Sequence, residues 1–462
     1  MVTARTQTMT RRTFLAVVSS AAVGLAAACG QAQSSDQPQA PGQPQANTSS
    51  RTLVFWHSYT QKARTDYMQQ LTDRFAKANP GVTVSIEVVP FPAFPQKWPA
   101  AQAGRALPDV SIAVAEDAIN MYTAGALYPM DDVLNDLGGA SAFLPGLLDK
   151  MSKYQDHYVL LPHYVHDRIL IYRKDRLQAA GVDMTPFTSD QVTWDDALKA
   201  ATATNQPPDH YGWILQLSKS DVAAGYLLWI LTRASDGHFW DQDGNVTFDS
   251  APVREAVSYL AEIGRKASPP DAVNYNINDN FNLVQGGKTT LAYDAAAVVA
   301  TALQQQPDVG NQLDVTFMPK KTQVGNLVGA VNLVLPRGHN QADAKNFVKF
   351  LFSEENYVPF LHTIPLFMFP SLAKATTKFL DEPTISQHRK IADITLKGVQ
   401  DGSGPGFDFG PNPWAGPAFA SHQVELMMQS ILLQNTPVEQ AVADTARQLG
   451  QVISGVKSKL KQ

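Results

Sequence analysis

Apolar and polar positions begin to follow regular periods just after residue 50. Residues 53–56 form an apolar run of strand length, and Met68, Leu71 and Phe75 then recur at spacings of three and four, which predicts an amphipathic helix. Apolar residues alternate with polar ones over residues 82–88, which predicts a second strand. This order of strand, helix and strand is typical of an α/β fold.

The stretch from Tyr158 to Asp175 contains two apolar runs of strand length, separated by a polar patch at residues 163–168. The patch includes Tyr164 and His166 together with a second histidine, an aspartate and an arginine. Polar groups inside a buried sheet are unfavourable unless they pair with one another or line a cleft. We therefore predict that the chain crosses here from one lobe to another, and that a ligand cleft lies at the crossing.

Further helical and strand patterns follow along the chain. Thr193 and Asp196 have the spacing of a capping box, with Asp at the position where Glu or Gln is usual. Residues 286–294 predict a turn into a short strand, residues 324–335 another strand, and residues 436–460 a long amphipathic helix.

Composition and charge exclude some classes of function. The chain has 462 residues with 37 basic and 42 acidic side chains, and removal of the three arginines before residue 13 leaves 34 basic residues and a formal net charge of −8. This acidic balance argues against nucleic-acid binding and against a basic membrane-binding surface. The ~410 residues after the N-terminal region are ample for two domains of roughly 100–200 residues each.

The N-terminal residues have the pattern of an export signal. Paired arginines at positions 11 and 12 precede Phe14 and Leu15, as in a twin-arginine signal, and no charge occurs from residue 14 to residue 28. Because this run is shorter than the about 20 apolar residues of a membrane span, we predict a signal peptide over residues 1–28. Met1 and Met9 are both candidate starts.

Cys29 is the only cysteine and follows the small residues that end the apolar run. This position favours a lipoprotein signal in which Cys29 is acylated; the alternative is an ordinary cleaved signal with a chance cysteine. Residues 30–50 are mostly Gln, Ser, Ala and Pro, too polar to bury a core. We predict that residues 29–51 are a lipidated cysteine and a flexible tether, which hold an exported protein at the outer face of the cell membrane.

Candidate ligand-binding residues follow two predicted strands. In open α/β sheets, ligands bind beyond the C-terminal ends of the strands. This rule selects Trp56, His57, Ser58 and Tyr59 at the C-terminal end of the first strand, and Glu116 and Asp117 after the apolar stretch at residues 109–115.

Aromatic side chains are candidate platforms for a sugar, whose binding combines apolar walls with a few convergent polar groups. For most of them core packing is an equally good explanation, and Trp98 also fits either role. Trp414 is better suited to a site, because it lies in a loop rich in proline and glycine at residues 410–417. The candidate platforms are Trp56, Tyr59, Trp229, Tyr293, Phe367 and Trp414.

Other chemistries find less support in the sequence. Glu116 and Asp117 could be a glycosidase pair, but adjacent residues on an extended segment point to opposite sides. The three histidines between residues 157 and 166 could suggest a metal, but they lack a paired cysteine or a His-Glu-x-x-His pattern. GGKTT at residues 286–290 lacks the spacing of a phosphate-binding loop. We expect a protein that is not an enzyme and that holds no metal and no cofactor.

Motifs along the chain are similar to those of a known family. They are FWHS at 55–58, FAKANPG at 75–81, LPD at 107–109, GALYPMDD at 125–132, IYRKD at 171–175, TWDD at 193–196, FNLVQG at 281–286 and FLFSEE at 350–355. In this order they resemble ABC-transporter solute-binding proteins of the family that includes the maltose- and glycerol-phosphate-binding proteins. The resemblance covers nearly all of the chain after residue 51.

The resemblance implies a two-lobe periplasmic-binding-protein fold of type II, with hinge crossings between the lobes and a ligand cleft between them. It implies a first lobe from residues 52–160 and 292–340, and a second lobe from residues 161–291 and 341–462.

The resemblance also implies roles for single residues. Glu116 and Asp117 fall where such proteins hold solute hydroxyls, and Gly329 falls where the backbone approaches the solute closely. Tyr164 and His166 depart from the small polar residues that are usual at the crossing. The expected ligand-binding residues are Trp56, His57, Ser58, Tyr59, Glu116, Asp117, Tyr164, His166, Trp229, Tyr293, Asp294, Gly329, Asn332, Phe367 and Trp414.

The expected function is the extracytoplasmic solute-binding component of an ABC importer, a monomer that closes on a sugar or oligosaccharide and delivers it to a membrane permease. Within the same family, the alternative solute is a glycerol phosphate or glycerophosphodiester, for which Lys97 or Arg168 would have to face the cleft. The alternative from another class is an exported carbohydrate-active enzyme that uses Glu116 or Asp117.

Overall fold

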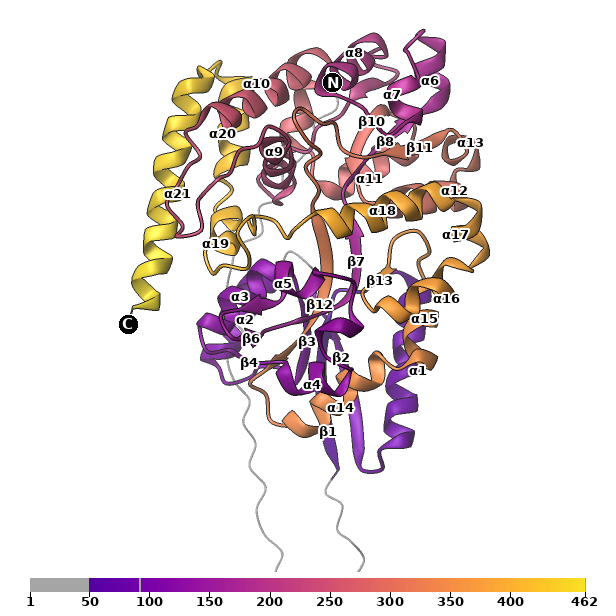
Figure 1. Cartoon of the computed structure of the whole chain (residues 1–462), viewed down its shortest axis with the longest axis vertical. Helices are drawn as coiled ribbons and strands as arrows, with labels where there is room; N and C mark the ends of the chain where they lie inside the picture. The colour runs from indigo at the N-terminus through magenta and orange to yellow at the C-terminus, as the bar shows by residue number, and fades with distance from the viewer. Residues whose placement is uncertain (1–49, 91–92, 462) are drawn as a thin grey trace, which may run out of the picture. The chain divides into compact units, whose positions relative to one another are not determined.

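The computed structural model describes residues 50–90 and 93–461. The predicted signal peptide, Cys29 and nearly all of the predicted tether lie outside these residues. The described chain contains a seven-stranded sheet, a four-stranded sheet and a two-stranded hairpin, and helices surround them (Figure 1). No helix in the described ranges has the length and apolarity of a membrane span.

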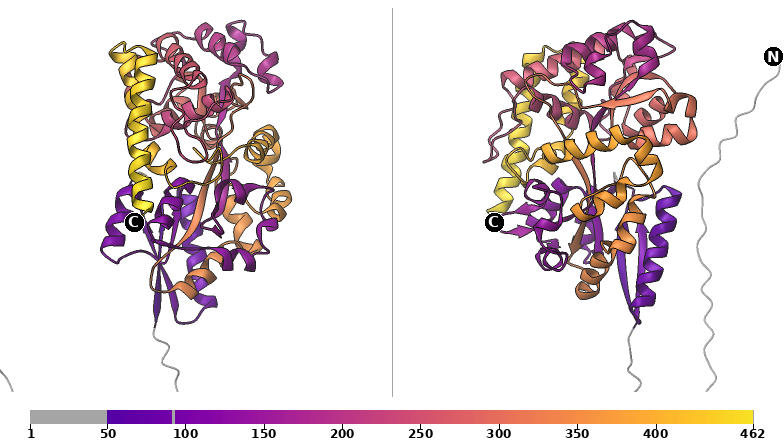
Figure 2. Two further views of the ribbon diagram at one scale, coloured as in Figure 1. Left: turned by 60° about the vertical axis from the view of Figure 1, so that its left-hand side comes forward. Right: turned by 45° about the vertical axis from the view of Figure 1, so that its right-hand side comes forward.

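The seven-stranded sheet begins with the predicted strand, helix and strand. Met68, Leu71 and Phe75 are buried on α1 (Lys62–Ala78), as their spacing predicted, and α1 lies alongside the β1–β2 edge (Figure 2). The strand order is β13-β7-β12-β3-β1-β2, with β4 paired to β12. The strands are β1 (Arg51–His57), β2 (Val82–Val88), β3 (Val110–Ala113), β4 (Leu127–Tyr128), β7 (Leu161–Asp167), β12 (Val328–Pro336) and β13 (Phe369–Pro370).

The four-stranded sheet has the order β11 (Leu313–Thr316), β8 (Ile169–Arg173), β10 (Thr289–Asp294) and β9 (Tyr211–Trp213). Next to it, α8 (Trp194–Ala203) begins at the predicted capping box: Asp196 donates its backbone N–H to the Thr193 side chain and accepts from the Thr193 backbone. Trp194 is buried and stacked on Tyr259.

The chain crosses between the two sheets at the end of the predicted polar patch, and not at the predicted lobe boundary between residues 160 and 161. β7 belongs to the seven-stranded sheet and ends at Asp167, whereas β8 belongs to the four-stranded sheet and begins at Ile169. Only Arg168 separates the two strands. β12 lies beside β7 in an antiparallel ladder that places Gly329 opposite His166 (Figure 1).

The predicted lobe boundaries differ from the pairing of the strands. The prediction gave residues 292–340 to the first lobe, but β10 and β11 pair with β8 in the four-stranded sheet. β13, which was given to the second lobe, pairs with β7, and Phe347 on α14 (Gln341–Leu351) packs edge-on against Phe55 of β1. The apolar period identifies a strand or helix, but it does not indicate which sheet the segment joins.

The other elements complete the α/β fold, and the C-terminal helix packs against α20 and α10 (Figure 1). In the first half of the chain they are α2 (Phe94–Ala103), α3 (Ala115–Thr123), α4 (Asp131–Asp136), η2 (Ala140–Ala142), α5 (Leu147–Met151), β5 (Lys153–Tyr154), β6 (His157–Tyr158), α6 (Lys174–Ala179), α7 (Thr185–Thr188) and α9 (Ala223–Ala234). In the second half they are α10 (Ala251–Lys266), η3 (Pro270–Asn274), α11 (Ile277–Gln285), α12 (Ala297–Gln305), α13 (Pro307–Gly310), α15 (Glu354–Leu361), η4 (Ala373–Ala375), α16 (Thr376–Leu380), α17 (Pro383–Gln387), α18 (Arg389–Asp401), α19 (Ala415–Ala420), α20 (Gln423–Leu433) and α21 (Val438–Leu460).

Candidate functional site

A cavity of about 370 Å³ lies beyond the C-terminal end of β3, where the strand-end rule places a ligand site. One wall comes from α2 and the β3–α3 turn of the seven-stranded sheet. The facing wall comes from the start of α9 and from α19. The lining residues are Phe94, Gln96, Trp98, Ile112, Ala113, Val114, Glu116, Asp117, Ser220, Asp221, Val222, Tyr226, Gly416, Phe419, Ala420 and His422.

Glu116 and Asp117 lie in the first turn of α3, where a helix favours negative charge. They therefore do not lie on an extended segment that points them to opposite sides, as predicted, because the strand already ends at Ala113. Both side chains line the cavity.

Glu116 is held between the two walls of the cavity. Its side chain is 4% exposed, and Tyr226 on α9 donates a hydrogen bond from its hydroxyl to Glu116 Oε1. Burial, and then the nearby Asp117 carboxylate, raise the pKa of Glu116 to about 7. Near neutral pH, Glu116 can therefore serve as a hydrogen-bond acceptor or, when protonated, as a donor.

Asp117 and Asp221 differ in the number of hydrogen bonds that their carboxylates already accept within the protein. Asp221 already accepts bonds from the backbone N–H groups of Ala223 (2.9 Å) and Ile277 (2.7 Å). In the part of the chain that the structure describes, no group donates a hydrogen bond to the Asp117 carboxylate, whose pKa burial raises to about 6. Asp117 is thus the carboxylate best able to accept hydrogen bonds from solute hydroxyls.

Aromatic rings supply the apolar part of the lining. Trp98 packs against Trp56 with ring centroids 5.5 Å apart, and Tyr226 meets Phe419 edge-on at 5.0 Å. Flat apolar faces together with carboxylates suit a solute that carries both C–H surfaces and hydroxyl groups.

No lysine or arginine is among the described residues that line this cavity. Lys97 pairs with Glu87 at 2.6 Å, and its Nζ lies 4.3 Å from the centre of the Trp56 ring. Arg168 pairs with Asp294 at 2.8 Å. The two cations that a phosphorylated solute would require are therefore bound elsewhere, and the carboxylates of the cavity would repel an anion.

Most of the residues selected around the end of β1 lie in the protein interior. His57 and Tyr59 are 1% and 0% exposed and are stacked at 4.6 Å. The guanidinium of Arg64 lies over the Tyr59 ring at 4.4 Å and donates a hydrogen bond to the hydroxyl of Tyr164 at 3.0 Å. Trp56 contributes by supporting Trp98, and Ser58 is partly exposed. None of them lines the cavity, and their role in binding stays a prediction.

The crossing strands hold a second group of the selected residues. His166 is stacked on Phe367 at 5.1 Å and lies so close to Gly329 that a Cβ there would meet its ring at 1.9 Å. Burial, and then the charge of Arg168, lower the pKa of His166 to about 3, so the ring is neutral. Asn332 donates from Nδ2 to the Ala113 carbonyl at 3.0 Å, which fixes the end of β3.

Trp229, Tyr293 and Asp294 also lie outside the cavity lining. Trp229 is fully buried and donates from Nε1 to Asp408 at 2.9 Å. Asp294 accepts from Arg168, whose guanidinium lies 5.7 Å from the centre of the Tyr293 ring. Their proposed contact with a solute remains untested.

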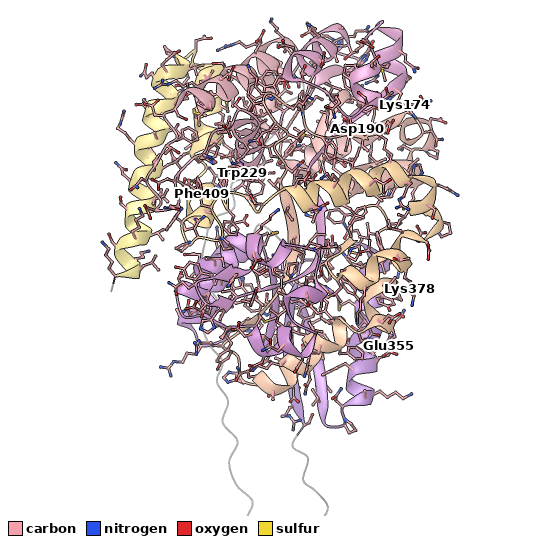
Figure 3. All side chains as sticks on the ribbon, in the orientation of Figure 1. Lys174, Asp190, Trp229, Glu355, Lys378 and Phe409 are labelled. Atoms are coloured by element: carbon pink, nitrogen blue, oxygen red, sulfur yellow. The ribbon has the colours of Figure 1, made fainter. Side chains whose placement is uncertain are left out.

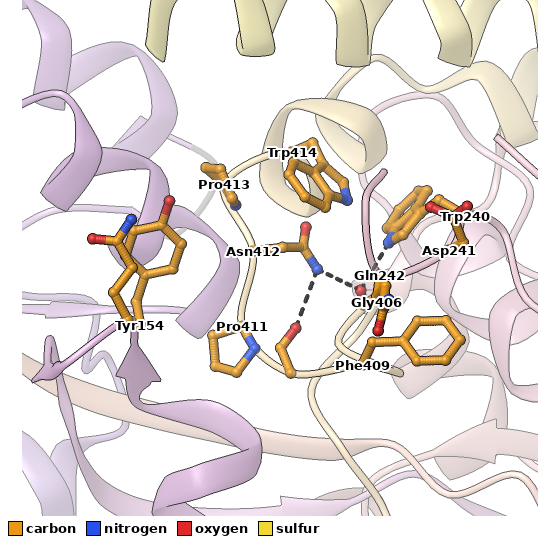
Figure 4. Close-up of a pocket in the computed structure, with 12 residues that line it drawn as sticks. Tyr154, Trp240, Asp241, Gln242, Gly406, Phe409, Pro411, Asn412, Pro413 and Trp414 are labelled. Carbon is orange, nitrogen blue, oxygen red and sulfur yellow. Dashed lines mark hydrogen bonds between the residues drawn. The ribbon is translucent and has the colours of Figure 1, made fainter. Parts of the chain in front are cut away.

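Trp414 lies in a different cavity, of about 310 Å³ (Figure 4). The two cavities are neighbours, because Trp414 is at the start of α19 and Gly416, two residues later, lines the first cavity. A Cβ at Gly416 would come within 2.9 Å of the Glu116 carbonyl oxygen, so only glycine permits this approach of α19 to α3.

Several residues that line the cavity were not predicted from the sequence, notably Tyr226, Phe419 and His422. Tyr226 lies three residues before the selected Trp229, on the same helix. The apolar period predicts the helix, but α9 is buried on most of its surface, so the period does not tell which aromatic faces a cavity.

The histidines of the crossing do not form a metal site. His163 is fully buried and stacked on Phe360 at 4.6 Å, whereas His157 pairs with Asp131 at 2.9 Å. Within the described ranges, no group of three or more His, Cys, Asp and Glu side chains is placed to hold a metal ion.

Comparisons with known proteins agree with this fold. The model of the family of bacterial extracellular solute-binding proteins matches residues 61–358. A mannitol-binding protein of Pseudomonas aeruginosa is 26% identical over 195 residues, which is 42% of this chain and 42% of that relative, less than half its length.

Solved structures of solute-binding proteins are similar over most of the chain. One from Thermotoga lettingae, bound with alpha-D-tagatose, is 20% identical with a TM-score of 0.75 and covers 87% of this chain and 100% of that chain. One from Agrobacterium vitis, with bound D-mannitol, is 20% identical with a TM-score of 0.70 and covers 88% of this chain and 99% of that chain. These likenesses confirm the two-lobe α/β fold, and the family match spans more than half of the chain: the protein belongs to the bacterial extracellular solute-binding proteins, a family of binding proteins rather than enzymes.

Proposed function

We propose that this protein is the exported solute-binding component of an ABC importer and that its solute is a neutral sugar or polyol. The proposal rests on the lining of the cavity beyond β3, which combines carboxylates with aromatic rings. Among the described residues, no lysine or arginine lines this cavity. The mannitol-binding relative and the tagatose- and mannitol-bound structures support the same class of solute.

Binding would act by closing the two walls of the cavity on the solute. α3 packs on β4 and β12 of the seven-stranded sheet, whereas α9 packs against α10 and α20, so a solute that contacts both Asp117 and Tyr226 stabilises their approach. The permease would then recognise the closed state and receive the solute. Acylation of Cys29 would keep the protein, a monomer, at the outer face of the membrane.

A glycerol phosphate is a poorer candidate, because Lys97 and Arg168 are both engaged by carboxylates away from the cavity. The expected preference for a neutral over a phosphorylated solute therefore follows from the position of these two cations.

Isothermal titration calorimetry with tagatose, mannitol, ribitol, glucose, maltose and glycerol 3-phosphate tests the proposal. We expect binding of a neutral solute, and we expect Asp117→Asn to weaken it by roughly tenfold or more, since a hydrogen bond to a charged group contributes about 1.5–3 kcal/mol. Asp66→Asn, which makes the same substitution at an exposed position on α1 outside the cavity lining, is the matched control. Binding of glycerol 3-phosphate alone would contradict the proposal.

A further inference from the structure

Helix α18 lies across the point where the chain passes from one sheet to the other (Figure 1). It packs against β7 and β12 of the seven-stranded sheet and against β11 of the four-stranded sheet. Near its first turn, the Lys390 ammonium lies 3.3 Å from Asp190 and 3.6 Å from Asp314 of β11 (Figure 3). Just after its end, the Ser403 carbonyl accepts the backbone N–H of Val328, the first residue of β12, at 2.9 Å. The two ends of α18 are therefore held by different sheets.

Asp167, the last residue of β7, lies directly against this helix. An added Cβ at Gly398 would meet Asp167 Oδ2 at 1.6 Å, so α18 can approach the crossing this closely only with glycine at that position. Asp167 is 1% exposed, and its Oδ1 accepts the backbone N–H of Arg168 at 2.8 Å. Its Oδ2 is buried and has no hydrogen-bond partner within the described ranges. One oxygen of the carboxyl group therefore faces α18 without a donor.

The charged and titratable groups around Asp167 come from β7, the crossing, β10 and α18, whereas β12 has no titratable side chain. They are His166, Arg168, Tyr293, Asp294, Lys397 and Asp401. Both cations of this set are already paired. Arg168 pairs with Asp294 at 2.8 Å. Lys397 pairs with Asp401 at 2.9 Å. Among the described residues, no cation is thus left to form an ion pair with Asp167.

Burial raises the pKa of Asp167 well above its ordinary value, and the nearby backbone N–H groups of Arg168 and Leu327 offset only part of this effect. A carboxyl group whose pKa is higher in the packed arrangement than in water stabilises that arrangement at low pH. This stabilisation is lost as the pH rises through the raised pKa. A charged Oδ2 gains free energy when water reaches it, which movement of α18 away from β7 would allow.

We infer that Asp167 makes the crossing a pH-sensitive hinge: with its carboxyl group protonated, α18 stays packed on β7, and when the group ionises, α18 moves off the crossing and the two walls of the ligand cavity separate. The inference goes beyond the proposed function, because it concerns the solute-free protein and does not depend on which solute binds. Where the proposed function also holds, the protein binds its solute more tightly at low pH, since the solute contacts both walls.

Small-angle X-ray scattering of the purified, solute-free protein at pH 5 and pH 9 tests the inference. In the unmodified protein the radius of gyration should be larger at pH 9, whereas Asp167→Asn, which cannot ionise at this position, should keep its pH 5 radius at both pH values. Hydrogen–deuterium exchange at pH 9 should show the backbone amides of α18 at least about fivefold better protected in Asp167→Asn than in the unmodified protein. Asp393→Asn, the same substitution at an exposed position of α18, is the matched control and should behave as the unmodified protein does.

Gly398→Ala provides an independent test of the same contact. Its Cβ would displace α18 from Asp167, so this variant should have the larger radius of gyration at both pH values. Thermal unfolding at pH 5 verifies that each variant is folded.

Three results would overturn the inference: an unmodified protein whose radius is the same at pH 5 and pH 9, an equal increase in Asp167→Asn, or a Gly398→Ala protein with the pH 5 radius of the unmodified protein. A pH response that persists in Asp167→Asn but disappears in Glu116→Gln would assign the effect to the ligand cavity and would also overturn it. None of these outcomes depends on a solute, so the proposed function stands or fails separately.

Discussion

Tyr226 donates a hydrogen bond to the Glu116 carboxylate and so joins α9, which packs against α10 and α20, to α3, which packs on β4 and β12. The bond lies at the edge of the cavity that both residues line. A polar contact in this position links closure of the two walls to occupation of the space between them.

Replacement of Tyr226 by Phe should weaken solute binding by roughly fivefold to tenfold, because a hydrogen bond contributes about 1 kcal/mol and this one joins the two walls of the cavity. Titration calorimetry measures the affinity, and small-angle scattering without solute should report a larger radius of gyration. Tyr259→Phe is the matched control: its hydroxyl donates to the Trp194 carbonyl at 2.9 Å within one part of the fold. The control should lose stability but not affinity, and equal affinity losses would refute the role of the Glu116 contact.

The raised pKa of Glu116 predicts a pH dependence of stability. A carboxyl whose pKa rises on folding from an ordinary 4.5 to about 7 binds its proton more tightly in the folded state. The stabilisation of the folded state by this proton is fully present below about pH 4.5 and is lost as the pH rises through about 7. Its upper bound is on the order of 3 kcal/mol.

Urea unfolding at pH 5 and pH 8 measures this effect. In Glu116→Gln, the free energy of unfolding should fall less between these two pH values than in the unmodified protein. Glu355→Gln, at an exposed position on α15, is the control and should leave the pH profile unchanged. An identical fall in Glu116→Gln would show that Glu116 does not titrate in this range.

Gly329→Ala should destabilise the crossing strands. The added Cβ would meet the His166 ring at 1.9 Å, and the ring is held by Phe367, so it has little room to move. Overpacking of this kind typically lowers the free energy of unfolding by about 1–3 kcal/mol. Gly450→Ala in α21 is the control, because no atom lies within 4 Å of its added Cβ, and it should raise stability by about 0.5–1 kcal/mol. Chemical denaturation measures the free energy of unfolding of both variants. A Gly329→Ala protein as stable as the unmodified protein would contradict this prediction.

Local patterns were sufficient to predict much of the fold. The spacing of Met68, Leu71 and Phe75 predicted the buried face of α1, and the polar interruption after Pro162 predicted where the chain changes sheets. Strand pairing was not predictable in the same way. β10, β11 and β13 are short strands whose partners are far away in sequence, so their periods do not reveal which sheet they complete.

The site was predictable only where backbone topology determines it. Glu116 and Asp117 were found because they follow a strand end, although α3 starts earlier than expected. Tyr226 and Phe419 were missed because their place in the cavity depends on the packing of helices from distant segments. Trp414 was selected for its loop, yet the structure places it in the neighbouring cavity.

A thermal-shift measurement of the purified protein with neutral sugars, alditols and glycerol phosphates tests the central claim most directly. A solute at 100 times its dissociation constant should add about 2.7 kcal/mol to the free energy of unfolding. The acidic, aromatic cavity predicts stabilisation by a neutral sugar or polyol and none by glycerol phosphates. Stabilisation by phosphorylated solutes alone would contradict it.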